Sequence, residues 1–102
     1  MDGSPLTENL EREIELMERT LEIFAIVREN QPIGISKIAR KMKIPEHKVR
    51  YSLRMLQKEK LIEPSGKGAI LTEKYEKFEE DIIDLLDSID ETVQKLEKKL
   101  KK

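Results

Sequence analysis

The first apolar pattern along the chain is a stripe whose members recur at alternating steps of four and three residues: Leu10, Ile14, Met17, Leu21 and Phe24. Steps of this size place side chains on one face of an α-helix. Ser4 and Pro5 suit the cap and the first position of such a helix, while Pro32 disfavours helical geometry at Gln31. The pattern therefore predicts a helix over about 5–30.

Two shorter apolar patterns follow, and the breaker Lys43-Ile44-Pro45 separates them. The first predicts an extended segment at 33–35 that leads into a helix over about 35–42. The second predicts a helix over about 45–59, opened by Pro45, with Val49, Leu53 and Leu56 facing inward. Two short helices joined by a turn of three or four residues match the helix-turn-helix unit.

A predicted hairpin comes next, because the short apolar runs 61–64 and 69–72 flank the turn sequence Ser65-Gly66-Lys67-Gly68. Pro64 has no N–H to donate, so one edge of this hairpin should be exposed.

The last pattern predicts a helix over about 73–101, capped by Thr72, with a heptad seam formed by Ile82, Leu86, Ile89, Val93, Leu96 and Leu100. A lone helix cannot bury such a seam. We expect it to join the stripe Leu10, Ile14, Met17 and Leu21 in a homodimer interface. The alternative is an antiparallel pair of the two long helices within a monomer.

Charge divides the chain into three parts. Residues 1–27 carry 2 basic and 7 acidic side chains, residues 28–67 carry 11 and 4, and residues 68–102 carry 7 and 10. The middle part is thus net basic within a chain of net charge −1. A polyanion would be attracted to this middle part and mostly repelled by the ends.

The run from Ile35 to Phe78 resembles the winged helix-turn-helix domain of prokaryotic and archaeal transcriptional regulators such as the MarR and PadR groups. Its apolar residues fall at that fold's core positions: Ile35, Ile38, Ala39, Met42, Ile44, Val49, Leu53, Leu56, Leu61 and Ile62. LTEKYEKF resembles those families' segment after the wing. Lys60 departs from the pattern, since glycine often stands there to adopt a left-handed conformation. The long heptad helix also resembles small archaeal winged-helix chromatin proteins that dimerise through a coiled coil.

The resemblance implies double-stranded DNA as the partner, with the helix at about 45–59 in the major groove and the wing, 62–72, on the flanking backbone. On that helix the face opposite Val49 is cationic. The expected DNA-binding residues are Ser36, Lys37, Arg40, Lys41, Lys43, His47, Lys48, Arg50, Tyr51, Arg54, Lys58 and Lys67. Arg50 and Arg54 can each present a planar fork to guanine. Tyr51 could instead pack its ring at the edge of the core.

Other chemistries have little support in the sequence. The chain has no Cys and a single His, so neither a thiolate site nor a His-rich metal site is expected. No acid–base pair or nucleophile constellation predicts catalysis, and no cofactor is expected. No segment has the apolar length of a membrane span. The expected location is cytoplasmic and nucleoid-associated, and no small-molecule effector is evident.

Together these patterns predict a mainly α (α+β) winged helix-turn-helix fold. We expect a packing and dimerising helix at 1–31, a DNA-binding core at 32–72 and a dimerising heptad helix at 73–102. The predicted function is a homodimeric DNA-binding transcriptional regulator. Two alternatives remain open: an architectural chromatin protein of the same fold, and a winged-helix module that binds other proteins.

Overall fold

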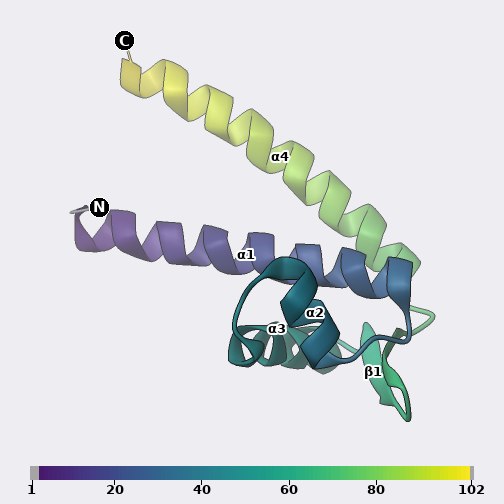
Figure 1. Cartoon of the computed structure of the whole chain (residues 1–102). Coiled ribbons are helices and arrows are strands. Elements are labelled where there is room, and N and C mark those ends of the chain that lie inside the picture. The colour runs from purple at the N-terminus through teal and green to yellow at the C-terminus, as the bar shows by residue number, and fades with distance from the viewer. Residues whose placement is uncertain (1–2, 102) are drawn as a thin grey trace. The chain divides into compact units, whose positions relative to one another are not determined.

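A computed structural model describes residues 3–101 of the chain. Along the sequence it contains α1 (Pro5–Asn30), α2 (Ile35–Met42), α3 (Glu46–Lys58), β1 (Ile62–Ser65), β2 (Gly68–Leu71) and α4 (Tyr75–Lys101) (Figure 1). The chain divides into two compact units, one up to Thr72 and one from Glu73 onward. Its helices and antiparallel hairpin confirm the expected mainly α, winged-helix fold. No helix among residues 3–101 is long and apolar enough to cross a membrane.

Helix α1 has the predicted bounds and presents two different faces. The Ser4 hydroxyl accepts a hydrogen bond of 3.2 Å from the Thr7 N–H, as expected of a helix cap. Its buried residues all lie in the second half: Thr20, Ile23, Phe24 and Val27. Leu10 and Ile14 of the heptad stripe are 54% and 58% exposed. At 100° per residue, the centre of the stripe lies roughly a quarter turn around the helix from the centre of the buried face, and Phe24 belongs to both.

The first unit has one hydrophobic core. The second half of α1 packs on α3 and β2, and α2 packs on α3 (Figure 1). Most of the predicted core residues are buried: Ile38, Ala39, Val49, Leu53, Leu56, Leu61 and Ile62. Ile35, Met42 and Ile44 are only half-buried, so for them the expectation was too strong.

The turn between α2 and α3 contains a left-handed residue and two hydrogen bonds to one carbonyl. Lys43 has a left-handed conformation (φ 58°), and the backbone N–H groups of Lys43 and Ile44 both bond to the Ala39 carbonyl. This arrangement satisfies carbonyls at the end of a helix. Pro45 is the cap residue of α3, which begins at Glu46, one residue later than predicted.

A buried pair of hydroxyl groups joins α1 to α3. Thr20 Oγ1 and Ser52 Oγ lie 2.8 Å apart, and Ser52 is fully buried. The Arg19 Nε also donates to Ser52 Oγ at 3.4 Å. Because a buried hydroxyl without a partner is destabilising, this pair fixes which residues of the two helices face each other.

The wing is attached to the body through Ile33. In the hairpin Ile62 pairs with Leu71 and Ser65 pairs with Gly68. Ile33 forms an additional bridge to Ala69, with reciprocal N–H to carbonyl bonds of 3.2 and 2.8 Å. Gly68 has a φ of 128°, and a Cβ there would lie 2.6 Å from the Ile33 carbonyl oxygen. Only glycine therefore allows the segment before α2 to approach the wing this closely.

Lys60 has the left-handed conformation that a glycine would adopt without steric cost (φ 62°). The local turn thus follows the fold's usual geometry despite the lysine. The Thr72 hydroxyl donates to the Lys60 carbonyl at 2.6 Å, which holds the two ends of the wing together. The predicted start of the last helix at 73 was wrong, since α4 begins at Tyr75.

The second unit consists of α4. None of its described residues is buried, and the seam residues Leu86, Ile89, Val93 and Leu96 are 36–49% exposed. Its polar faces carry ion pairs one turn apart, including Lys77 Nζ to Asp81 Oδ1 at 2.7 Å. This hydrogen bond and the charge of Asp81 raise the pKa of Lys77 above its ordinary value.

Replacing Gly68 tests the close approach of Ile33 to the wing. Gly68→Ala should lower the free energy of unfolding by about 2–4 kcal/mol, because the new Cβ meets backbone and the positive φ becomes strained. Gly66→Ala is the matched control, since a Cβ at Gly66 meets nothing within 4 Å. Urea denaturation of both variants measures the difference, and equal stabilities would contradict this account of the wing.

A double-mutant cycle tests the hydroxyl pair between α1 and α3. Ser52→Ala should destabilise the protein by about 1–2 kcal/mol, because the Thr20 hydroxyl stays buried and loses its partner. Adding Thr20→Val to Ser52→Ala should recover much of this loss, since no buried hydroxyl then lacks a partner. Urea denaturation measures the free energy of unfolding of each variant. If the effects of the two substitutions on this free energy simply add, the two hydroxyls are not coupled.

Candidate nucleic-acid interface

The solvent-facing side of α3 carries the cations predicted from the sequence. Val49, Leu53 and Leu56 are buried, and this fixes the rotation of the helix about its axis. Five candidate residues on the opposite side are exposed: His47, Arg50, Tyr51, Arg54 and Lys58. Tyr51 is 52% exposed, so part of its side chain faces solvent and part of it is covered. Lys48 is also exposed.

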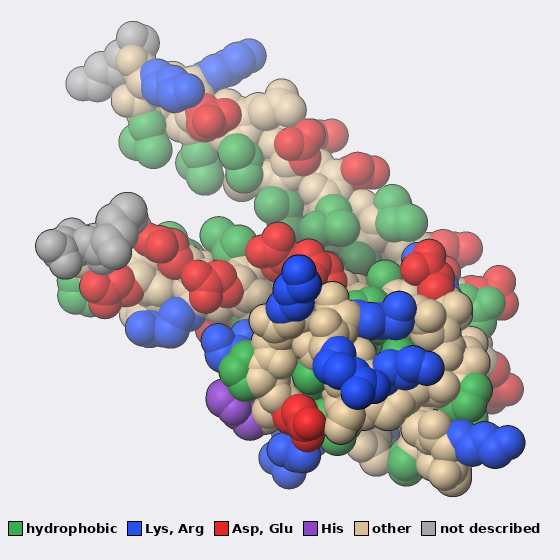
Figure 2. Space-filling view, viewed as in Figure 1, with side chains coloured by type: hydrophobic (Ala, Val, Ile, Leu, Met, Phe, Trp, Pro, Cys, Tyr) green, Lys and Arg blue, Asp and Glu red, His purple; other side chains and the backbone are tan. Residues whose placement is uncertain are grey.

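Further cations lie on α2 and in the turn after it. Figure 2 shows lysines and arginines gathered over one face of the first unit, with the chain's one histidine at the edge of the same view. The four candidates from this segment are all exposed: Lys37, Arg40, Lys41 and Lys43. Since α2 packs on α3, the two helices together form a surface with many more cations than carboxylates.

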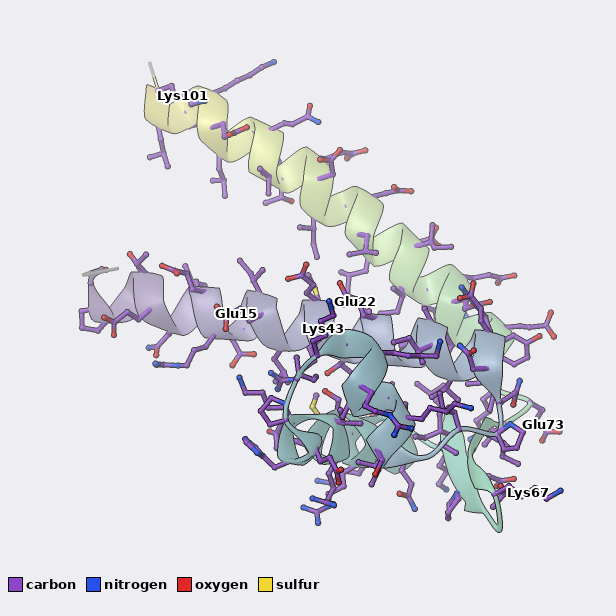
Figure 3. The ribbon with its side chains drawn as sticks, in the orientation of Figure 1. Glu15, Glu22, Lys43, Lys67, Glu73 and Lys101 are labelled. Atoms are coloured by element: carbon purple, nitrogen blue, oxygen red, sulfur yellow. The ribbon has the colours of Figure 1, made fainter. Side chains whose placement is uncertain are left out.

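Lys67 lies at the turn of the wing, where its side chain projects into solvent (Figure 3). The turn is held by Ser65, whose hydroxyl donates to the Gly68 carbonyl at 2.6 Å and accepts from the Lys67 N–H at 3.2 Å. The Gln31 side chain accepts a bond of 2.8 Å from the Leu71 N–H. Both ends of the hairpin are therefore fixed by side chains, and Lys67 is presented on an ordered turn.

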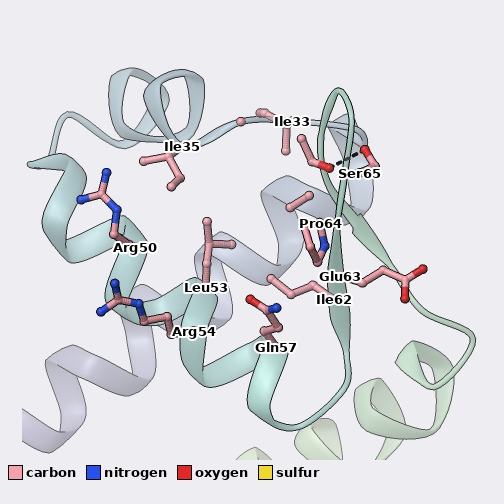
Figure 4. A pocket seen from close by; sticks show the side chains of 13 residues that line it. Ile33, Ile35, Arg50, Leu53, Arg54, Gln57, Ile62, Glu63, Pro64 and Ser65 are labelled. Atoms are coloured by element: carbon pink, nitrogen blue, oxygen red, sulfur yellow. Dashed lines mark hydrogen bonds between the residues drawn. The ribbon is translucent and has the colours of Figure 1, made fainter.

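A groove of about 340 Å³ separates α3 from the wing. Its apolar lining includes Ile33, Ile35, Leu53, Ile62, Pro64 and Ala69. Arg50, Arg54 and Gln57 line it from α3 (Figure 4). The Glu63 carboxylate points to the far side of the hairpin in the same view, away from the arginines. The two arginines thus lie beside a concave apolar surface with no carboxylate directed at them from the wing.

One carboxylate does lie among the candidate residues. Glu46, the first residue of α3, accepts a hydrogen bond of 3.1 Å from the Ser36 hydroxyl through Oε2. Its Oε1 lies 3.9 Å from Arg50 Nη2. The structure therefore brings Ser36, at the start of α2, and Arg50, on α3, to the same acidic side chain.

Sequence reasoning missed Gln57 and the pairing of Glu46 with Ser36. Gln57 follows Arg54 by three residues and Arg50 by seven, and this helical spacing could have placed it on the same face. Ser36 and Glu46 are ten residues apart on different helices, so no local spacing indicates their contact. Among residues 3–101 no three His, Cys, Asp or Glu side chains come together as metal ligands would.

Residues 16–86 match the family described as the CggR N-terminal DNA binding domain. The chain belongs to this family of DNA-binding domains. The match covers α2, α3 and the wing, together with much of α1 and the first part of α4. It agrees with the DNA-binding resemblance drawn from the sequence, whereas the likeness to the MarR and PadR groups stays a prediction. No curated protein matches the chain closely enough to add a named relative.

Proposed function

We propose that this protein is a transcriptional regulator that binds double-stranded DNA as a homodimer. In this proposal α3 enters the major groove, Arg50 and Arg54 contact base edges, and Lys67 on the wing contacts the flanking backbone. The cations of α2 and the turn after it contact phosphates: Lys37, Arg40, Lys41 and Lys43. Ser36, His47, Lys48, Tyr51 and Lys58 complete the proposed surface.

The observation that carries this proposal is the exposed cationic side of α3 in a chain of a DNA-binding family. Its rotation is fixed by buried residues on the other side, so the cations are held at the surface before DNA arrives. In a helix-turn-helix, the N-terminal residues of the second helix contact base edges. Arg50 lies one turn into α3 and Arg54 one turn further on the same face, and this spacing supports contacts of both with the groove.

The proposed homodimer is supported by the apolar residues that are exposed within each unit. The heptad seam of α4 is exposed from Leu86 to Leu100 and half-buried at Ile82, and the stripe of α1 is exposed at Leu10 and Ile14. Apolar heptads at this spacing are stabilised by packing against another helix. In the proposal a second copy covers the seam, so that two DNA-binding surfaces can read half-sites about one helical turn apart.

Fluorescence anisotropy with random and genomic duplexes across salt concentrations tests the DNA proposal. Binding should weaken steeply as salt rises, because phosphate contacts release counterions. Arg50→Glu combined with Arg54→Glu should weaken binding by at least about tenfold at roughly 50 mM salt. Lys95→Glu with Lys98→Glu on α4 is the matched control, since it changes the net charge equally outside the proposed surface.

The outcomes separate the candidate functions. Absence of binding to any duplex at low salt would overturn the DNA proposal. Equal affinity for random and genomic duplexes would favour the architectural protein, and an arginine double variant whose function is unchanged would favour the protein-interaction module.

Light scattering tests the homodimer. The expected mass is about 24 kDa, twice the 12.0 kDa of one chain. Ile89→Glu with Val93→Glu should give the monomer mass, because it places charge within the seam. Ser88→Glu is the control, since Ser88 lies off the seam and is exposed. A mass of about 12 kDa for the unmodified protein at micromolar concentration would contradict the proposal.

A further inference from the structure

The carboxylate of Glu46 has an unusual position for a protein that binds a polyanion. It is the first residue of α3, the end of the helix that lies nearest to base edges in a helix-turn-helix complex. Its side chain is 52% exposed among the cations of the candidate surface. A carboxylate brought close to phosphates is repelled unless it finds a hydrogen-bond donor on the DNA.

The contacts of Glu46 orient its carboxylate and leave some of its hydrogen-bond acceptor positions unused. Ser36 Oγ donates to Oε2 at 3.1 Å, and Arg50 Nη2 lies 3.9 Å from Oε1. An ionised carboxylate has about four acceptor positions on its two oxygens, so acceptor capacity remains on both. Ser36 belongs to α2, so the contact joins the two helices of the motif and limits where the carboxylate can point.

Stability alone does not account for this arrangement. An exposed ion pair one helical turn apart contributes about 0.3–0.5 kcal/mol, and the distance between Glu46 and Arg50 is at the long end for an ion pair. The pair also leaves the Arg50 guanidinium beside the first residue of α3. A glutamate also suits the positive end of the helix dipole, but that role requires no contact with Ser36 or Arg50.

We propose that Glu46 is a specificity-determining residue, which accepts a hydrogen bond from a cytosine N4 amino group and opposes binding wherever that group is absent. In the major groove the cytosine amino group is a donor that a glutamate can accept. Arg50, one turn further on the same face, then contacts a neighbouring guanine. This inference rests on the DNA-binding function proposed above.

The proposal explains how a surface rich in cations distinguishes one DNA sequence from another. Lysines and arginines bind phosphates irrespective of sequence. Glu46 weakens that general attraction at every site, and the cytosine contact offsets the repulsion only at sites with the right base. When Arg50 moves away from Glu46 to bind guanine, the hydrogen bond from Ser36 keeps the carboxylate oriented.

The test begins with selection of duplexes from a random library by the wild-type protein and by Glu46→Gln. Wild-type selection should enrich cytosine at one position of each half-site, and the variant should lose that preference. In anisotropy measurements, Glu46→Gln should bind the selected duplex about tenfold more weakly, through loss of the charged acceptor. It should bind random duplexes about threefold more tightly, through loss of the repulsion.

Two further variants separate specificity from structure. Glu59→Gln removes the same charge at the exposed other end of α3, and it should leave the base preference unchanged. Ser36→Ala keeps the charge but frees the carboxylate, so it should reduce the cytosine preference by less than Glu46→Gln does. The thermal midpoint of Glu46→Gln should stay near that of the wild type, because the glutamine still accepts from Ser36.

Each result decides a different claim. An unchanged cytosine preference and an unchanged ratio of selected to random affinity in Glu46→Gln would overturn this inference while leaving the DNA-binding function intact. A lower thermal midpoint with equal weakening on every duplex would show that Glu46 only links α2 to α3, which also overturns it. Failure of the wild-type protein to bind any duplex would instead remove the proposed function, and this inference with it.

Discussion

The reciprocal backbone bonds between Ile33 and Ala69 hold the proposed DNA-binding surface together. They join the segment before α2 to the wing, and the absence of a Cβ at Gly68 makes the close approach possible. With Ile33 buried against the wing, the start of α2, the wing and α3 enclose one groove. Without this bridge the hairpin would lose its backbone connection to the segment before α2 and would keep its strand pairing, the Gln31–Leu71 bond and its packing on α1 and α3.

The arrangement of α1 and α3 depends on a second, polar constraint. Apolar packing is not directional, so the side chains of Ile23 and Val27 alone would tolerate small rotations of α1. The Thr20–Ser52 pair restricts those rotations, because both hydroxyls are buried and each is the other's partner. Leu10 and Ile14 lie in the first half of α1, where no described residue is buried, and they are therefore exposed for the helix packing that we propose.

Charge on the candidate surface is organised by contacts between helices as well as by composition. A net-basic middle part attracts polyanions in general. The contacts of Glu46 with Ser36 and Arg50 place one carboxylate among these cations in a defined orientation. In our proposal, the cations attract any DNA and Glu46 repels DNA that lacks the matching cytosine. Both effects arise from the same few turns of helix, so substitutions at Arg50 and Glu46 should change DNA binding in different ways.

The sequence by itself determined the helices and most of the core, because helical periodicity and capping are local: α1 and α2 have the predicted bounds, and Val49, Leu53 and Leu56 face inward. The resemblance to winged-helix regulators raised a left-handed conformation at Lys60 as one of two possibilities, and the structure shows that conformation. The tertiary structure alone decided the Ile33–Ala69 bridge, the Thr20–Ser52 pair and the contact of Ser36 with Glu46. Such contacts join residues 10 to 36 positions apart, and their partners are chosen by how whole elements pack, which no local spacing encodes.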